Sequence, residues 1–432
     1  MTDLESYWIP FTSNRRFKKE PRVLVRAEGI YFWNAAGDRL LDGCSGLFCC
    51  ALGHGRREIG DAVARQYGQL DYGPAFQYSH PGAFELANLL ATVTPGDLNH
   101  FFFVNSGSES VDTAMKIALL YHRSRGEGQR QRFVSRERSY HGVNFGGVSL
   151  GGLVKNREDF GPGLPGVVHM RHTWLEENRF VPGQPERGVE RAEDLQRLVD
   201  LYGGDTIAAC FVEPIAGSTG ILVPPRGYLE RLREICDRTG ILLVFDEVIT
   251  GFGRTGHAFG AQAFEVLPDV ITVAKALTNG ALPMGAVAVR DEIYEVITSS
   301  AAEGKIELFH GYTYSAHPLA CAAAIATQTI FRDEGIFERA AALAPYFLER
   351  VFDLRTLPIL RDIRGYGLLA GLDLAPGERE GERGFAVLQR LYAAGLVVRM
   401  TGDTLILAPA LIAEREHIDQ ICEIVGNTLS AV

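Results

Sequence analysis

The stretch Ile241-Leu242-Leu243-Val244-Phe245-Asp246 is an unbroken apolar run that ends in a carboxylate. A strand without alternation between apolar and polar residues is typical of a sheet that is buried on both faces. Similar runs occur at His100–Val104, Ile207–Val212 and Val270–Val273, with helical patterns such as Tyr228–Arg238 between some of them. This pattern predicts an α/β fold, with a mostly parallel sheet between helices.

The pattern changes near residue 336, and the 432 residues are enough for two domains. Helix-like Phe337–Phe352 precedes strand-like Gly367–Leu374, and the strand-like segments Leu396–Arg399 and Thr404–Leu407 follow. We therefore predict a large domain over residues 56–330 and a smaller α+β domain over residues 331–432. The N-terminal segment, residues 1–55, is expected to pack with the smaller domain.

The composition excludes several classes of protein. A net charge of -10 argues against a nucleic-acid partner, because neutralising phosphates requires a basic surface. No stretch reaches the length of about 18 apolar residues that a membrane span needs, and the N-terminus lacks the profile of a signal peptide. The seven cysteines show no disulfide or zinc spacing. A cytoplasmic enzyme with free thiols is the resulting prediction.

Lys275 stands apart among the six lysines of the chain. It follows the apolar run Val270–Val273 and precedes a loop of small residues, whereas the other five have ordinary surface contexts. Burial lowers the pKa of an amine and favours its neutral form, which is the form that attacks an aldehyde. The alternative is a lysine that reaches from a strand end to solvent.

Asp246 lies 29 positions before Lys275 and is placed at the carboxyl end of a central strand, where open α/β sheets build their sites. A buried carboxylate there needs a charged partner, and a protonated pyridine nitrogen is one. The pair Asp246-Glu247 also resembles the magnesium-binding strand of a nucleotide triphosphatase. That alternative requires a lysine followed by serine or threonine, and no lysine of this chain has one.

Two further motifs follow predicted strands. Asn105-Ser106-Gly107-Ser108-Glu109-Ser110 opens a helix, so its backbone N–H groups and hydroxyls can bind a phosphate, or Ser106 can act as an ordinary N-cap. Tyr140-His141-Gly142 places an aromatic ring where it can stack on a cofactor or pack in the core. His169 and His172 have no third ligand nearby in the sequence, so no metal site is expected.

Together these segments resemble the class III (omega) aminotransferases of pyridoxal 5′-phosphate (PLP) fold type I, and most of all their omega-amino acid:pyruvate, or β-alanine:pyruvate, branch. The resemblance covers essentially the whole chain. Beyond the segments quoted above, it rests on Trp8-Ile9-Pro10-Phe11-Thr12, Leu41-Asp42-Gly43, Glu213–Gly220, Phe245-Asp246-Glu247-Val248, Ala274-Lys275 and His310-Gly311-Tyr312-Thr313-Tyr314-Ser315.

The resemblance implies a role for each matching position. Lys275 forms the Schiff base with PLP, and Asp246 pairs with the pyridine nitrogen. The remaining cofactor-binding residues are Ser106, Gly107 and Ser108 at the phosphate, Tyr140 and Val248 on the two ring faces, His141 beside Tyr140, Glu213 close to Asp246, and Thr313 at the phosphate of the partner subunit. Sharing Thr313 in this way implies a homodimer, and a homotetramer is compatible with it.

The same resemblance implies a substrate site. Arg399 grips the substrate carboxylate, and Phe11, Phe48, Phe76 and Tyr140 line an apolar pocket. Phe48 stands where related enzymes often have tryptophan, and Ala276 where many have glycine. We therefore predict a ping-pong aminotransferase that moves an amino group from an omega-amino acid or primary amine to pyruvate. Alternatives are a 4-aminobutyrate, ornithine or taurine transaminase, a semialdehyde aminomutase, or a fold type I decarboxylase.

Overall fold

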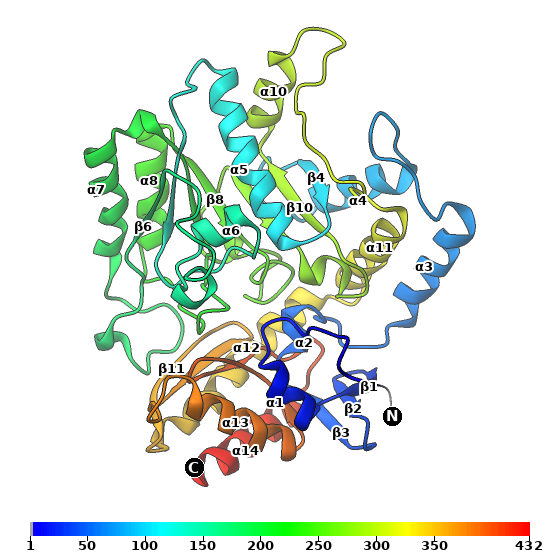
Figure 1. The fold of residues 1–432 in the computed structure, drawn as a ribbon, viewed down its shortest axis with the longest axis vertical. Coiled ribbons are helices and arrows are strands. Elements are labelled where there is room, and N and C mark those ends of the chain that lie inside the picture. The colour runs from blue at the N-terminus through cyan, green and yellow to red at the C-terminus, as the bar shows by residue number, and fades with distance from the viewer. Residues whose placement is uncertain (1–2) are drawn as a thin grey trace.

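The computed structural model describes residues 3–432, and its centre is a seven-stranded sheet (Figure 1). Only β10 runs antiparallel to its neighbours, so the sheet is mostly parallel, as predicted. In spatial order the strands are β4 (His100–Val104), β10 (Gly285–Val289), β9 (Val270–Val273), β8 (Leu242–Asp246), β7 (Ile207–Val212), β5 (Arg132–Arg136) and β6 (Val167–Met170).

The central strand β8 is buried on both faces, which explains its unbroken apolar sequence. Leu242 and Val244 pack in a cluster with α5 (Gly107–Ser124), whereas Leu243 and Phe245 pack in the larger core with α8 (Tyr228–Thr239). Side chains alternate between the two faces of a strand. Asp246, two residues after Val244, therefore falls on the face where α5 begins.

Helices cover both faces of this sheet (Figure 1). Besides α5 and α8, the helices of this part of the chain are α3 (Arg57–Gln69), α4 (Pro81–Ala91), α6 (Phe145–Leu150), α7 (Glu193–Tyr202), α9 (Gly260–Ala263), α10 (Asp291–Ser300) and α11 (Pro318–Asp333). Among residues 3–432, no helix combines the length and the apolar character needed to cross a membrane.

Two four-stranded sheets lie apart from the large sheet, in the lower part of Figure 1. The first has the order β1 (Leu24–Glu28), β2 (Tyr31–Asn34), β3 (Arg39–Asp42), β13 (Leu396–Val397). The second has the order β11 (Leu360–Tyr366), β12 (Leu369–Leu374), β15 (Thr404–Leu407), β14 (Arg399–Thr401). The helices with them are α1 (Asn14–Lys19), α2 (Ser45–Phe48), α12 (Ile336–Phe352), α13 (Glu382–Ala393) and α14 (Arg415–Ser430). The N-terminal and C-terminal parts of the chain meet directly, because β3 and β13 pair in parallel.

The prediction of one strand over Leu396–Arg399 is wrong. The chain leaves one sheet after Val397 and enters the other at Arg399, since β13 pairs with β3 and β14 pairs with β15. The strand expected from Gly367 begins at Leu369 instead, because Gly367 has a positive φ of 59° and forms the turn after β11.

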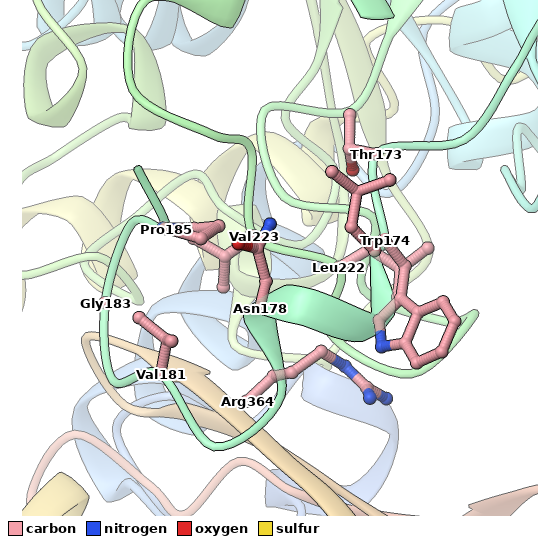
Figure 2. A pocket seen from close by; sticks show the side chains of 10 residues that line it. Thr173, Trp174, Asn178, Val181, Gly183, Pro185, Leu222, Val223 and Arg364 are labelled. Atoms are coloured by element: carbon pink, nitrogen blue, oxygen red, sulfur yellow. The ribbon is translucent and has the colours of Figure 1, made fainter. Parts of the chain in front are cut away.

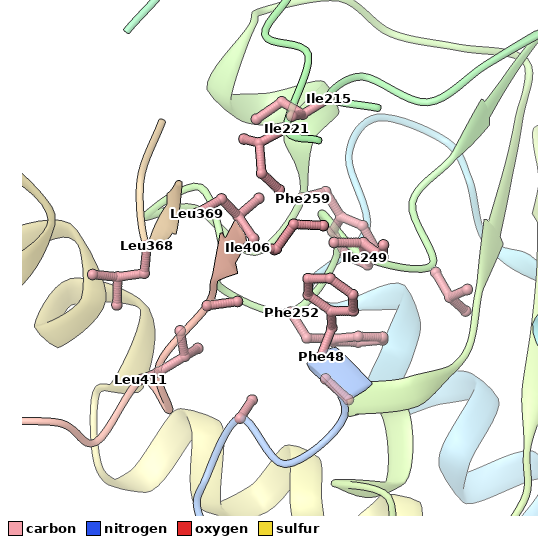
Figure 3. Close-up of a cluster of buried hydrophobic side chains, with 14 of the residues drawn as sticks. Phe48, Ile215, Ile221, Ile249, Phe252, Phe259, Leu368, Leu369, Ile406 and Leu411 are labelled. Atoms are coloured by element: carbon pink, nitrogen blue, oxygen red, sulfur yellow. The ribbon is translucent and has the colours of Figure 1, made fainter. Parts of the chain in front are cut away.

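One continuous core joins the large sheet to the C-terminal strands. Figure 3 shows the part of this core around Phe48. Here Ile249, Phe252 and Phe259 meet Leu369 and Ile406, which come from β12 and β15. Phe48 thus sits at the junction, and its main surroundings are other apolar side chains.

Candidate active site

A cavity of about 130 Å³ opens where strands of the large sheet end and α5 begins. It contains most of the residues expected at a cofactor site. Its lining is Gly107, Ser108, Tyr140, His141, Gly142, Glu213, Asp246, Val248, Ile249, Ala274 and Lys275. The sequence did not single out Ile249, which follows Val248, and it named Ala274 only as the neighbour of Lys275.

Lys275 follows β9 in the left-handed backbone region, with φ of 49°. This conformation is strained for a residue with a side chain, and it starts the tight turn Lys275–Thr278. Within residues 3–432 no carboxylate lies within 4.0 Å of the amine. Burial lowers the pKa of Lys275, although the thiol of Cys49 and the carboxylates of Asp246 and Glu213 oppose the shift. The side chain therefore supplies a neutral amine more readily than an ordinary lysine.

Asp246 is held from two sides. Its Oδ2 lies 2.8 Å from Nδ1 of His141, and its Oδ1 accepts a hydrogen bond from the N–H of Val248 at 3.2 Å. The other ring nitrogen of His141 lies 3.1 Å from the hydroxyl of Ser135. The carboxylate is thus fixed in orientation while it borders the cavity, which suits it to pair with a cationic group there.

The start of α5 forms a cradle for an anion. Ser106 is the N-cap, and its hydroxyl accepts from the N–H of Glu109 at 3.2 Å. Gly107 and Ser108 lie in the first turn of α5, where no carbonyl of the same helix is available to accept from their N–H groups. Both residues border the cavity, so these N–H groups remain available to an anion. The hydroxyl of Ser110 donates to the carbonyl of Val273 at 3.0 Å, which ties this turn to the strand that leads to Lys275.

Two glycines let the walls of the cavity approach one another. A Cβ at Gly107 would lie 3.1 Å from both γ-carbons of Val248. A Cβ at Gly142, where φ is 103°, would lie 2.5 Å from the hydroxyl of Ser108. That hydroxyl accepts from the N–H of Val143 at 3.0 Å. The cradle and the Tyr140–Gly142 loop are therefore in direct contact.

Glu213 braces the same loop from the end of β7. Its two carboxylate oxygens accept from the N–H groups of Tyr140 at 3.0 Å and Gly217 at 3.1 Å. Burial raises its pKa, and the nearby negative charge of Asp246 adds to the shift. Burial also raises the pKa of the Tyr140 hydroxyl. Glu213 thus fixes the backbone that presents Tyr140 to the cavity.

A larger cavity of about 1410 Å³ adjoins the first and shares Tyr140 and Lys275 with it. Four predicted substrate residues line it, namely Tyr140, Phe11, Phe48 and Arg399. The Nζ of Lys275 lies 5.7 Å from the centre of the Phe48 ring. Arg138, Trp174, Ser218 and Thr219 also line this space, and no sequence pattern pointed separately to Arg138 or Trp174.

Thr313 and Phe76 are not brought to either cavity in this chain. Both are exposed, and the hydroxyl of Tyr72 donates to the carbonyl of Thr313. Phe76 instead lines a separate surface cavity of about 290 Å³, whose lining also includes Phe84 and His310. Within this chain, Phe76 thus does not join Phe11 and Phe48 in the predicted pocket, and Thr313 does not border the α5 cradle.

Figure 2 shows a different space, between the Thr173–Pro185 segment, Leu222, Val223 and Arg364 of β11. Its volume of about 20 Å³ is close to that of a single buried water site. It shares no residue with the 130 Å³ cavity and only Trp174 with the 1410 Å³ cavity, and it is too small to hold a cofactor or a substrate.

The residues present fit PLP. A cradle of free N–H groups suits a phosphate, a buried carboxylate suits a pyridinium, and a lysine amine whose pKa is lowered by burial suits an aldehyde. Gly107 and Gly142 also provide the close approach that this arrangement needs. The fold and this cavity define a PLP-dependent enzyme of fold type I.

Comparisons with known proteins identify the family. Residues 12–429 match the family described as "Aminotransferase class-III". The chain is 50% identical to an omega-aminotransferase of Caulobacter vibrioides, with 100% of this chain and 98% of that protein covered. It is 45% identical to an omega-amino acid–pyruvate aminotransferase of Pseudomonas putida, with 99% and 96% covered. The chain belongs to the class III aminotransferases, and its cofactor is PLP.

Solved structures agree with this assignment. An (S)-enantioselective omega-transaminase from Thermomicrobium roseum has a TM-score of 0.93 and 36% identity, with 99% of this chain and 97% of that one covered. An amine transaminase from an uncultivated Pseudomonas species, in a PLP-bound form, has a TM-score of 0.94 and 33% identity, with 99% of each chain covered. The predicted fold is confirmed.

Proposed function

We propose that this enzyme transfers the amino group of an omega-amino acid or primary amine to pyruvate, and so forms alanine and an aldehyde or ketone. The observation that carries the proposal is that Lys275, Tyr140 and Arg399 line one large cavity, while Asp246 and the α5 cradle lie in the adjoining one. The names of the relatives from Caulobacter vibrioides and Pseudomonas putida support the choice of omega-amino donors, and the second supports pyruvate.

PLP, when bound, supplies an aldehyde that condenses with amines and a ring that accepts the electron pair left when a carbon loses its proton. Lys275 acts as the base that takes that proton and returns it, since burial favours its neutral amine. Asp246, oriented by His141, keeps a proton on the pyridine nitrogen. Gly107 and Ser108 hold the phosphate through backbone N–H groups, and Ser106 caps the helix that presents them.

The walls of the site position the ring and the substrate. Tyr140 and Val248 pack against the cofactor ring, and Glu213 holds the backbone of Tyr140 in place. Arg399 offers two parallel hydrogen bonds to the carboxylate of pyruvate. Phe11 and Phe48 give the larger cavity apolar surface for amines without a carboxylate.

The active unit in this proposal is a homodimer. Thr313 reaches the phosphate of the partner's cofactor, and Phe76 contributes to the partner's substrate pocket. The support is that both residues are exposed and lie away from this chain's own cavities. Several other large apolar side chains are exposed as well, among them Phe84, Phe145, Phe309 and Tyr314, and a dimer would cover such residues. A tetramer remains compatible with this arrangement.

The proposal also includes the division into a large domain, residues 56–330, and a small domain, residues 331–432, that packs with residues 1–55. The pairing of β3 with β13 supports it. A cytoplasmic location is proposed because the seven cysteines are free thiols in the structure.

The experiment that tests the reaction is a donor and acceptor panel on the purified PLP-loaded enzyme. We expect alanine to form from pyruvate with β-alanine and with 1-phenylethylamine, with parallel double-reciprocal plots. Activity only with 4-aminobutyrate or ornithine and 2-oxoglutarate would contradict the pyruvate assignment. A product formed from a single substrate, without a second oxo-acid, would indicate an aminomutase.

A further inference from the structure

Arg138 places a guanidinium at the larger cavity and has no role in the proposed reaction as described so far. It precedes Ser139 and Tyr140, and its backbone has a positive φ of 50°, which is rare for a residue with a long side chain. The N–H of Arg138 donates to the carbonyl of Gly152 at 3.1 Å. This close approach requires glycine at position 152, because a Cβ on Gly152 would lie 2.5 Å from the nitrogen of Arg138. The strained backbone directs the side chain into the space that Lys275 and Arg399 also line.

The charge of Arg138 has no direct partner in residues 3–432. No carboxylate lies within 4.0 Å of it, and its one hydrogen bond goes to the carbonyl of Thr219 at 3.3 Å. Asp362 and Asp373 lie nearby, but both are bonded to Arg364. Burial lowers the pKa of Arg138 and the positive charge of Arg364 adds to the shift, although the carboxylates of Asp373 and Asp362 oppose it. A half-buried cation with four free N–H donors is suited to bind an anion.

Arg138 and the short strand that carries Arg399 are bonded to the same loop. The carbonyl of Thr219 accepts from Arg138, and the carbonyl of Ser218 accepts from the hydroxyl of Thr401 at 2.8 Å. Thr401 lies on β14, the short strand that begins with Arg399. Neighbouring residues of one loop thus hold the guanidinium of Arg138 and the strand that carries Arg399, and both arginines line the same cavity.

The two proposed substrates need carboxylate sites at different distances from the reacting carbon. In pyruvate the carboxylate is bonded to the carbon that receives the amino group. In an omega-amino acid, one or more methylene groups separate the carboxylate from the carbon that carries the amine. The positive charge of Arg399 lowers the pKa of both Lys275 and Tyr140, whereas the main charges beside Arg138 belong to Arg364, Asp373 and Asp362. Arg399 is thus the arginine nearer to the reacting centre.

We propose that Arg138 binds the distal carboxylate of omega-amino acid donors, while Arg399 binds the carboxylate of pyruvate. The inference rests on the proposed function and assigns its donor specificity to a residue. Two arginines in fixed positions then bind the carboxylates of a long and a short substrate, and Arg399 does not have to move when an omega-amino acid donor binds.

The test compares R138Q with a matched control, R179Q. Arg179 lines the same cavity but is paired with Glu176 at 3.5 Å. KM and kcat are measured for pyruvate and for four donors, namely β-alanine, 4-aminobutyrate, 6-aminohexanoate and 1-phenylethylamine. We expect R138Q to raise KM about tenfold or more for at least one omega-amino acid, whereas KM should change about twofold at most for pyruvate and for the carboxylate-free donor. R179Q is expected to behave as the wild type, and R138K to recover part of the loss. Equal losses for 1-phenylethylamine, or no loss for any omega-amino acid, would overturn the inference.

A binding measurement separates this inference from the proposed reaction. Hexanoate, which has the distal carboxylate but no amine, is titrated against the wild-type and R138Q holoenzymes by calorimetry and by its inhibition of 1-phenylethylamine turnover. Weaker binding to R138Q supports the role of Arg138 even if no omega-amino acid is turned over. Equal binding to both proteins overturns it, even if the panel confirms an omega-amino acid:pyruvate aminotransferase.

Discussion

The imidazole of His141 lies 2.8 Å from the carboxylate of Asp246, and the two side chains are 0% and 6% exposed. His141 is in turn 3.1 Å from the hydroxyl of Ser135, which lies on β5, so two strands of the sheet are linked through one ring. The orientation of the Asp246 carboxylate therefore depends on its neighbours. It points into the cavity because His141 and the N–H of Val248 hold its two oxygens.

His141→Leu should therefore weaken the site without removing a group that we expect to contact the substrate. Oδ2 of Asp246 loses its buried partner, at a cost of about 1–3 kcal/mol. We expect the Kd for PLP, measured by titrating the apoenzyme, to rise about tenfold or more, and kcat to fall. His141→Gln, which keeps a donor, should lose less. Wild-type PLP affinity in His141→Leu would show that the bond does not orient Asp246.

Lys275→Ala should abolish turnover and the visible absorbance of lysine-bound PLP. Burial lowers the pKa of this amine. Among the described residues, the one other lysine that lines either cavity of the site is Lys155, which borders the larger cavity. Lys155 is exposed and paired with Glu158 at 3.3 Å, so Lys155→Ala is the control and should keep both properties. Absorbance and activity are measured on the same preparations. Retention of either property in Lys275→Ala contradicts the assignment.

The sequence predicted the central strands and the positions of Lys275 and Asp246 because a strand buried on both faces needs a continuous apolar run. It did not reveal β11, since that strand carries Asp362 and Arg364, which are buried and bonded to each other. In the sequence, two charged residues this close together are typical of an exposed loop, because their buried ion pair is not visible there. The bond between His141 and Asp246, and the place of Arg138, depend on contacts between distant segments, which no local pattern encodes.

Gly107→Ala should disturb the phosphate cradle. The new Cβ would lie 3.1 Å from both γ-carbons of Val248, which is tight, so the start of α5 or Val248 has to move. We expect weaker PLP binding, by about tenfold, an effect of about 1.4 kcal/mol. Adding Val248→Ala supplies the missing space and should restore part of the affinity. If the double variant binds PLP no better than Gly107→Ala, the contact with Val248 is not the cause.

Arg399→Gln should impair the half-reaction with pyruvate far more than the half-reaction with 1-phenylethylamine. The substitution removes a charge-assisted bidentate pair with the carboxylate, and we expect the KM for pyruvate to rise about 10- to 100-fold. 1-Phenylethylamine has no carboxylate and should react at a rate close to that of the wild type. Stopped-flow measurement of each half-reaction separates the two effects. Equal losses in both would place Arg399 outside the carboxylate site.

We expect Glu247 to make the stability of the enzyme depend on pH between about pH 5 and 8. The carboxyl is 1% exposed, and burial raises its pKa from 4.5 to about 7, despite hydrogen bonds from Thr250, Gly260 and Ala261. A group whose pKa is raised on folding stabilises the folded state fully below its unfolded pKa, and this contribution is lost as the pH rises through the folded value.

The loss from this one carboxyl is about 3 kcal/mol at most. Denaturant unfolding of the holoenzyme at fixed protein and PLP concentrations should therefore show stability falling from pH 5 to pH 8. Glu247→Gln, which has no proton to lose, should reduce that slope whatever its absolute stability. Glu58→Gln is a suitable control, because the local backbone and Arg56 lower the pKa of this surface carboxyl and it titrates below the window. An unchanged slope in Glu247→Gln would assign the pH dependence to other groups.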